Sequence, residues 1–244
     1  MDILNWRAKR QIFYLAIFAA LALAILGAAI FWFSSEPTCF DGRKNQKEEE
    51  IDCGGPCGKK CAGETKNPAV LWSRAIKTSD GIYDAAALVE NPNIFAGIQS
   101  LPYKFKLYDQ RNVLVGVREG EIFVNPAERF MIFEPGIVTK EKIPARAVLE
   151  MAAKEEIDWV RIEKNPPNFS VEKKTFYKDP FPFLEVKVHN SSLTSFPEVY
   201  VNAVIYDKDN NVQAASQTVL DAVEPDALRF AFFTWQKPFE KEAE

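Results

Sequence analysis

Four cysteines carry the clearest chemistry in this 244-residue sequence, and all of them lie between residues 39 and 61. Cysteines so close together in a polar segment form disulfides or bind zinc. Their Cys-x3-Cys-x3-Cys spacing is unlike the paired Cys-x2-Cys of zinc knuckles, so we predict two disulfides. Four cysteines allow three pairings, and the sequence does not choose among them. The cysteines are Cys39, Cys53, Cys57 and Cys61.

Oxygen-bearing side chains lie between these cysteines, at Asp41, Asn45, Glu48 and Asp52. Carboxylate and amide oxygens are the ligands that calcium prefers. The spacing is not that of an EF-hand loop, and Asp and Asn also stabilise turns by accepting backbone N–H bonds. We therefore expect a hydrogen-bonded loop, with calcium binding as the alternative and no other cofactor.

Groups that commonly perform catalysis are sparse in the sequence. The one histidine, His189, stands beside an expected turn, and we find no Gly-x-Ser-x-Gly, phosphate-binding loop or His-Glu-x-x-His motif. Hydrophobic residues make up 47% and charged residues 26% of the chain, which excludes a disordered protein. The formal net charge of -4 lacks the basic footprint of a nucleic-acid-binding protein. We therefore expect a protein that is not an enzyme, with no nucleic-acid partner.

One apolar segment, residues 12–33, contains no charged residue. As a helix it would extend roughly 33 Å, enough to cross a hydrocarbon core of about 30 Å. Arg7, Lys9 and Arg10 precede it, so the positive-inside rule places the N-terminus in the cytoplasm and everything after Phe33 outside. A cleaved signal peptide is the alternative, because Gly27 begins a run of small residues, but the apolar run exceeds a signal core. We predict an uncleaved single-pass anchor in the cell membrane.

The remaining sequence reads as short strands in an order that occurs twice. Residues 103–108 and 184–188 alternate apolar with polar side chains, as half-buried strands do. We also expect both units to open with Trp-x-Arg, at Trp72 and Trp159. An offset of 98 or 99 residues over three landmarks indicates an internal duplication into two antiparallel β-sandwiches. The landmark pairs are Asn91 and Asn190, Tyr108 and Tyr206, and Pro126 and Pro225.

The sequence Phe105-Lys106-Leu107-Tyr108-Asp109 resembles the signature of the FxLYD domain family. The second unit reads Ala203-Val204-Ile205-Tyr206-Asp207, which keeps Tyr-Asp and departs at the Phe and Leu positions. The resemblance implies tandem immunoglobulin-like sandwiches outside the cytoplasm, with a divergent second copy and no particular chemistry. Alternation places Phe105 and Leu107 in the core and Tyr108 on the other face, and Asp109 begins a turn.

The cysteine segment resembles a recurrent motif of bacterial and archaeal surface proteins. Residues 39–42 read Cys-Phe-Asp-Gly, and residues 52–57 read Asp-Cys-Gly-Gly-Pro-Cys. This resemblance implies a short surface stalk.

The full prediction is a mainly β chain of two immunoglobulin-like antiparallel sandwiches, one transmembrane helix and a small disulfide-rich stalk. We expect its parts to be a cytoplasmic segment (1–11), the helix (12–33), the stalk (34–66), a first sandwich (67–153) and a second sandwich (154–244).

Aromatic residues near the start of the second unit form a candidate binding lip: Phe176, Tyr177, Phe181 and Phe183. The favoured alternative is that they close the end of the sandwich. Asn168-Phe169-Ser170 and Asn190-Ser191-Ser192 match the N-glycosylation pattern.

For function, these features predict a non-catalytic, membrane-anchored surface or envelope protein that binds a protein or glycan partner. One alternative is an accessory subunit of a membrane-embedded secretion or pilus-type assembly, in which the helix carries the specificity. A further alternative is an envelope enzyme whose site the sequence does not reveal.

Overall fold

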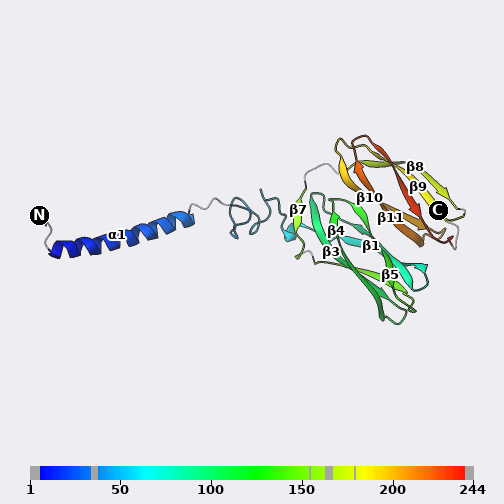
Figure 1. Cartoon of the computed structure of the whole chain (residues 1–244), viewed down its shortest axis with the longest axis horizontal. Coiled ribbons are helices and arrows are strands. Elements are labelled where there is room, and N and C mark those ends of the chain that lie inside the picture. The colour runs from blue at the N-terminus through cyan, green and yellow to red at the C-terminus, as the bar shows by residue number, and fades with distance from the viewer. Residues whose placement is uncertain (1–5, 34–37, 154, 163–166, 179, 240–244) are drawn as a thin grey trace. The chain divides into compact units, whose positions relative to one another are not determined.

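The computed structural model describes residues 6–33, 38–153, 155–162, 167–178 and 180–239. It contains two compact units, residues 1–57 and 58–244 (Figure 1). The predicted boundary residue 154 lies outside the described residues, as do the first residues of the expected cytoplasmic segment and of the stalk.

Helix α1 (Trp6–Phe33) confirms the predicted apolar helix. It begins at Trp6 and not at Ile12, because Arg and Lys are good helix formers and extend it toward the N-terminus. The guanidinium of Arg10 lies 4.9 Å from the ring centroid of Trp6. An 18-residue stretch of this helix has a mean hydropathy of 2.5. The span Trp6–Phe31 meets the length and apolarity of a membrane span, criteria that a signal sequence also meets.

The cysteine segment is oxidised, which confirms the predicted disulfides. Cys39 is bonded to Cys57 with 5.7 Å between their Cα atoms, and this bond answers the pairing that the sequence left open. Cys53 and Cys61 are also disulfide-bonded, and no described cysteine is free. Oxidised cysteines offer no thiolate to a metal ion.

Two adjacent glycines allow the backbone of the cysteine segment to turn tightly. Gly54 and Gly55 have φ of 74° and 54°, in the left-handed region that side chains disfavour. A Cβ at Gly55 would overlap the carbonyl oxygen of Lys47, and one at Gly54 would lie 2.7 Å from Cβ of Glu49. The Cys-Gly-Gly sequence is therefore a steric requirement of this fold.

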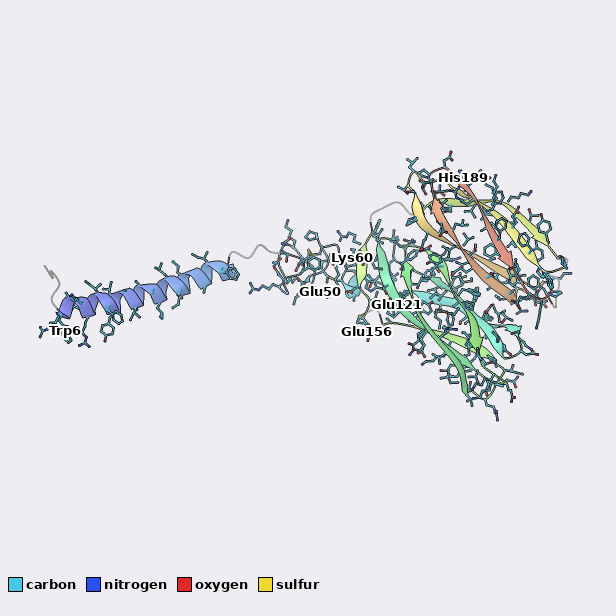
Figure 2. The ribbon with its side chains drawn as sticks, viewed as in Figure 1. Trp6, Glu50, Lys60, Glu121, Glu156 and His189 are labelled. Atoms are coloured by element: carbon cyan, nitrogen blue, oxygen red, sulfur yellow. A yellow bond between two sulfur atoms is a disulfide. The ribbon has the colours of Figure 1, made fainter. Side chains whose placement is uncertain are left out.

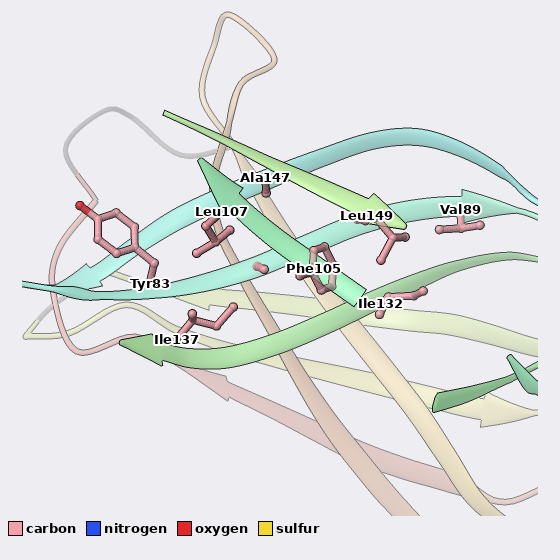
Figure 3. Close-up of a cluster of buried hydrophobic side chains, with 10 residues drawn as sticks. Tyr83, Val89, Phe105, Leu107, Ile132, Ile137, Ala147 and Leu149 are labelled. Atoms are coloured by element: carbon pink, nitrogen blue, oxygen red, sulfur yellow. The ribbon is translucent and has the colours of Figure 1, made fainter. Parts of the chain in front are cut away.

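The first sandwich is built from two antiparallel sheets around one core. Alternation in β2 turns Ala85, Ala87 and Val89 inward, where they meet Phe105 and Leu107 of β3 (Figure 3). All five are fully buried, and burying a side chain such as Phe105 stabilises the fold by about 1.5–3 kcal/mol. One sheet has the order β1-β2-β5 and the other β4-β3-β6. The strands are β1 (Ala69–Ser79), β2 (Ile82–Glu90), β3 (Ala96–Tyr108), β4 (Leu114–Val124), β5 (Arg129–Val138) and β6 (Arg146–Met151).

The second sandwich pairs a three-stranded sheet, β12-β9-β8, with a two-stranded sheet, β10-β11. Its core includes Val186 and Val188 of β9, Leu220 of β11 and Phe233 of β12. Together the two sandwiches confirm the predicted mainly β fold. The strands are β8 (Phe169–Tyr177), β9 (Phe183–Asn190), β10 (Phe196–Tyr206), β11 (Val212–Val223) and β12 (Leu228–Thr234).

The prediction that Trp159 opens the second unit is wrong. Strand β7 (Trp159–Arg161) pairs antiparallel with the first residues of β3, at Ala96–Ile98. Trp159 is fully buried beside Leu101 in the first sandwich. A large indole stabilises the fold more when it is buried in this core than when it is exposed at the start of a strand. Trp159 therefore belongs to the first sandwich, although the two Trp-x-Arg sequences are similar.

A buried asparagine side chain closes one end of the first sandwich. Asn91 is fully buried, and its Nδ2 donates to the carbonyl oxygens of Ala96 (2.8 Å) and Asn125 (2.9 Å). Its Oδ1 accepts the N–H of Asn93 (3.1 Å). One side chain thus joins the first residue of β3 to the residue that follows β4.

The second sandwich uses the same set of bonds at Asn190. This residue is also fully buried, and its Nδ2 donates to the carbonyl oxygens of Thr194 (3.0 Å) and Glu224 (2.9 Å). Its Oδ1 accepts the N–H of Ser192 (3.0 Å). The burial also excludes glycosylation of folded Asn190, although its sequence matches the pattern.

The outer face of sheet β1-β2-β5 packs against the outer face of β10-β11. Ile76, Ala86 and Met131 from the first sandwich are buried with Ala215 of β11. Asp84 shares this side of β2, and its carboxylate accepts the N–H of Gly136 (2.8 Å). Burial raises the pKa of Asp84 because desolvation disfavours the charged carboxylate.

We predict that Gly55→Ala prevents normal formation of the disulfides, because its Cβ would overlap the Lys47 carbonyl. Labelling of denatured, unreduced protein with a thiol reagent should show free cysteines. Gly58→Ala is the control, since Gly58 has no atom within 4 Å of the added Cβ. Complete oxidation of the Gly55→Ala protein at the normal rate would contradict this steric account.

We also predict that Asn190→Ala lowers the free energy of unfolding by about 2–4 kcal/mol, because it leaves buried carbonyl oxygens without donors. Urea unfolding of the full chain in detergent, followed by tryptophan fluorescence, measures this loss. Asn168→Ala replaces an exposed asparagine of the same sandwich and should change stability by less than about 0.5 kcal/mol. Equal effects of the two substitutions would refute the role of the buried amide.

Candidate interaction surfaces

The FxLYD-like residues have structural positions in both sandwiches. Phe105 and Leu107 are fully buried, and the ring of Tyr108 lies 4.9 Å from the guanidinium carbon of Arg146. The carboxylate of Asp109 accepts the N–H groups of Arg111 (2.8 Å) and Val113 (2.9 Å) and so shapes the turn into β4.

Asp207 makes the equivalent turn after Tyr206 in the second sandwich. Its carboxylate accepts the N–H groups of Asp209 (2.9 Å) and Asn211 (2.8 Å). Asn112 and Asn210, the fourth residues of the two turns, have nearly equal φ of 59° and 60°. The Tyr-Asp pair therefore begins the same hairpin turn twice.

The carboxylates among the predicted calcium ligands accept hydrogen bonds from the loop that contains them. Asp52 accepts the N–H groups of Asp41 (3.0 Å) and Gly42 (3.1 Å), and buried Glu48 accepts those of Asn45 (3.2 Å) and Asp52 (3.2 Å). A hydrogen bond from the Asn45 side chain, the largest of several contacts, lowers the pKa of Asp41. Glu48 is also grouped with Cys39 and Cys57, but those two cysteines are bonded to each other.

The predicted aromatic lip separates into different environments. Phe176 stacks on Phe239, whose ring also contacts Trp235, so Phe176 belongs to a cluster at the sandwich end. Tyr177 and Phe183 lie 5.7 Å apart on the outer face of β8 and β9. Phe181 precedes β9 and is 57% exposed.

Tyr177 and Phe183 continue into a row of aromatic side chains across the sheet. Phe183 lies 5.9 Å from Phe232, which lies 6.3 Å from Phe230, measured between ring centroids. Tyr177, Phe230 and Phe232 are each about half exposed. We call these four residues the aromatic row. In the sequence, Phe230 and Phe232 alternate with Ala231 and Phe233, which indicates that the first two share one face of a strand. Only the strand order of the structure shows that this strand, β12, lies beside β9.

A groove of about 660 Å³ runs beside β10, which we call the β10 groove. Its lining is largely apolar, and Ile94, Phe95 and Phe123 of the first sandwich are 68%, 61% and 50% exposed. Phe123 contacts Tyr200 of β10, with ring centroids 6.1 Å apart. The described lining residues are Ile94, Phe95, Phe123, Asn125, Pro126, Ala127, Glu128, Ile162, Pro167, Phe169, Ser170, Val171, Val188, Phe196, Glu198, Val199, Tyr200, Val201 and Asn202.

His189 lies near one end of the second sandwich and joins two side chains that the sequence did not connect with it (Figure 2). Its Nε2 is 2.8 Å from Oδ1 of Asp226, and its Nδ1 is 3.2 Å from Oγ of Ser191. The Asp226 side chain is 93% exposed, and none of the three residues lines the β10 groove. A solvated carboxylate provides little of the low-dielectric environment on which a Ser-His-Asp site depends.

No protein-family model matches the chain, and no curated protein matches its sequence.

We predict that calcium does not stabilise the cysteine segment, because its carboxylates already bind backbone N–H groups. Adding about 1 mM calcium, a concentration typical of weak extracellular sites, should leave the unfolding temperature and the calorimetric baseline unchanged. Asp52→Asn provides the comparison, since it keeps one acceptor oxygen and removes the charge. A calcium-dependent stabilisation that this substitution abolishes would establish the calcium alternative.

Proposed function

We propose that this protein is a non-catalytic, membrane-anchored binding protein whose second sandwich presents the aromatic row to a protein or glycan partner. The observation that carries the proposal is the exposure of adjacent aromatic rings on one sheet face. Contiguous exposed apolar groups mark interaction sites, and aromatic side chains dominate the energy of many interfaces. Rings held on neighbouring strands also lose little conformational freedom when a partner binds.

The proposed location is outside the cytoplasm, with α1 as the anchor. The basic residues Arg7, Lys9 and Arg10 at the start of the helix favour a cytoplasmic N-terminus. Four oxidised cysteines after the helix support this orientation, because disulfides persist in oxidising compartments.

The two sandwiches are proposed to be a tandem pair of FxLYD-like domains that arose by duplication. The matched side-chain bonds of Asn91 and Asn190, and of Asp109 and Asp207, support this origin. Divergence then left the aromatic row on the second copy, where Phe230 and Phe232 lie.

We expect replacement of Phe230 and Phe232 by serine to weaken partner binding at least about tenfold, because the substitutions remove two large apolar contacts. Wild-type and variant full-length proteins in nanodiscs are compared by quantitative crosslinking to native envelope fractions and on a glycan array. Leu193→Ser is the control, since Leu193 is an exposed apolar residue outside the row.

Unchanged binding by the double variant would contradict the role of the aromatic row. If replacing α1 by an unrelated apolar helix abolishes binding while the double variant retains it, the assembly-subunit alternative is favoured. Esterase activity that Ser191→Ala removes would instead favour an enzyme.

A further inference from the structure

The two sandwiches differ in how the strand next to the hairpin turn is covered. In the first, β3 pairs with β4 on one side and with β6 and β7 on the other. In the second, β10 pairs with β11 alone among the strands of the described residues. One edge of β10 thus corresponds to the side of β3 that pairs with β6 and β7.

The β10 groove lies along this edge of β10. Consecutive residues from Glu198 to Asn202 line it, and consecutive side chains of a strand point to opposite faces. Phe169 and Val171 of β8 also line it. Strand β8 is the counterpart of β1, which β6 approaches in the first sandwich. The groove therefore lies where the first sandwich holds additional strands.

The first sandwich also shows which backbone groups face the open side. Ala145 donates its N–H to the carbonyl oxygen of Tyr108 (2.7 Å), and Ala152 donates to that of Pro102 (3.2 Å). Alternate residues of β3 therefore point toward β6. The counterparts of these residues in β10 lie 98 positions later in the sequence. They direct their backbone N–H and C=O groups toward the open edge of β10, and they are Tyr200, Asn202 and Val204.

Beyond Pro197 and Glu198 at its start, β10 lacks the features that keep free edges from pairing. Residues 199–205 contain no proline, glycine or charged residue, and their pairing with β11 is regular up to Ile205. The edge strand β8, by contrast, has Glu172, Lys173 and Lys174 and a register shift after Val171. Charged side chains and bulges usually protect exposed edges from pairing. Residues 199–205 of β10 therefore resemble a strand that is paired on both sides.

We infer that the β10 edge binds an extended segment of a partner protein, which adds antiparallel to β10 and inserts alternate apolar side chains into the β10 groove. The inference rests on the proposed binding function and names its mode and ligand class. Strands β6 and β7 of the first sandwich illustrate this mode of binding. Strand β7 pairs with β3 through its backbone, and its Trp159 side chain is fully buried.

Charge and space further define the segment. Glu128 and Glu198 are charged, and no cationic side chain lies among the described lining residues, so a basic residue in the segment complements the groove. The first sandwich also lines the groove, through Ile94, Phe95 and Phe123, so the added segment would contact these side chains as well as β10.

The test uses a fluorescent peptide with the sequence of residues 146–161, which contains β6 and β7, and the full-length protein in nanodiscs. Fluorescence anisotropy should show saturable binding with a Kd below about 1 mM, and a scrambled peptide should bind at least about tenfold more weakly. Val201→Lys places a charge on the core side of the edge strand and should weaken binding at least about tenfold. Val219→Lys, on the outer face of neighbouring β11, is the matched control and should bind normally.

Hydrogen exchange of the wild-type protein gives a second measurement that does not depend on a variant. Bound peptide should slow amide exchange at Asn202 and Val204, while Ala203, which points toward β11, should change little. Absence of saturable binding, or binding without this alternate protection, would overturn strand addition. If the Phe230 and Phe232 double variant loses its native partner while Val201→Lys retains it, the proposed function stands and strand addition fails.

Discussion

The buried amides of Asn91 and Asn190 are the interaction on which both sandwiches depend. Each Nδ2 satisfies carbonyl oxygens from two separate segments, in a region from which water is excluded. Buried carbonyl groups without donors are costly, so no apolar side chain can replace the amide. Each amide therefore holds the start of one strand against the end of the next.

The two sandwiches resemble each other in strand order but differ in their surroundings. In the first, β6 and β7 cover β3, and the outer face of β1-β2-β5 is occupied by the second sandwich. In the second, the aromatic row and the edge of β10 are accessible. The cluster of Ile76, Ala86, Met131 and Ala215 thus buries one face of the first sandwich, while the second sandwich keeps the exposed surfaces for which we propose binding.

The cysteine segment reaches a defined structure by other means. Its strongest constraints are covalent bonds, backbone turns at Gly54 and Gly55, and carboxylates that accept N–H groups. Disulfides reduce the entropy of the unfolded chain and so replace much of the apolar core that so short a segment lacks. The carboxylates of Glu48 and Asp52 accept these backbone N–H groups.

The sequence by itself determined the elements whose information is local. The uncharged apolar run predicted α1, alternation placed Phe105 and Leu107 in a core, and Asp109 and Asp207 marked their turns. Only the tertiary structure decided which distant segments meet. It assigned Trp159 to the first sandwich, paired Cys39 with Cys57, joined Phe230 and Phe232 to Tyr177 and Phe183, and left an edge of β10 without a described partner strand. Periodicity reports the face of a strand on which a side chain lies, whereas strand order and pairing depend on packing free energies between residues far apart in the chain.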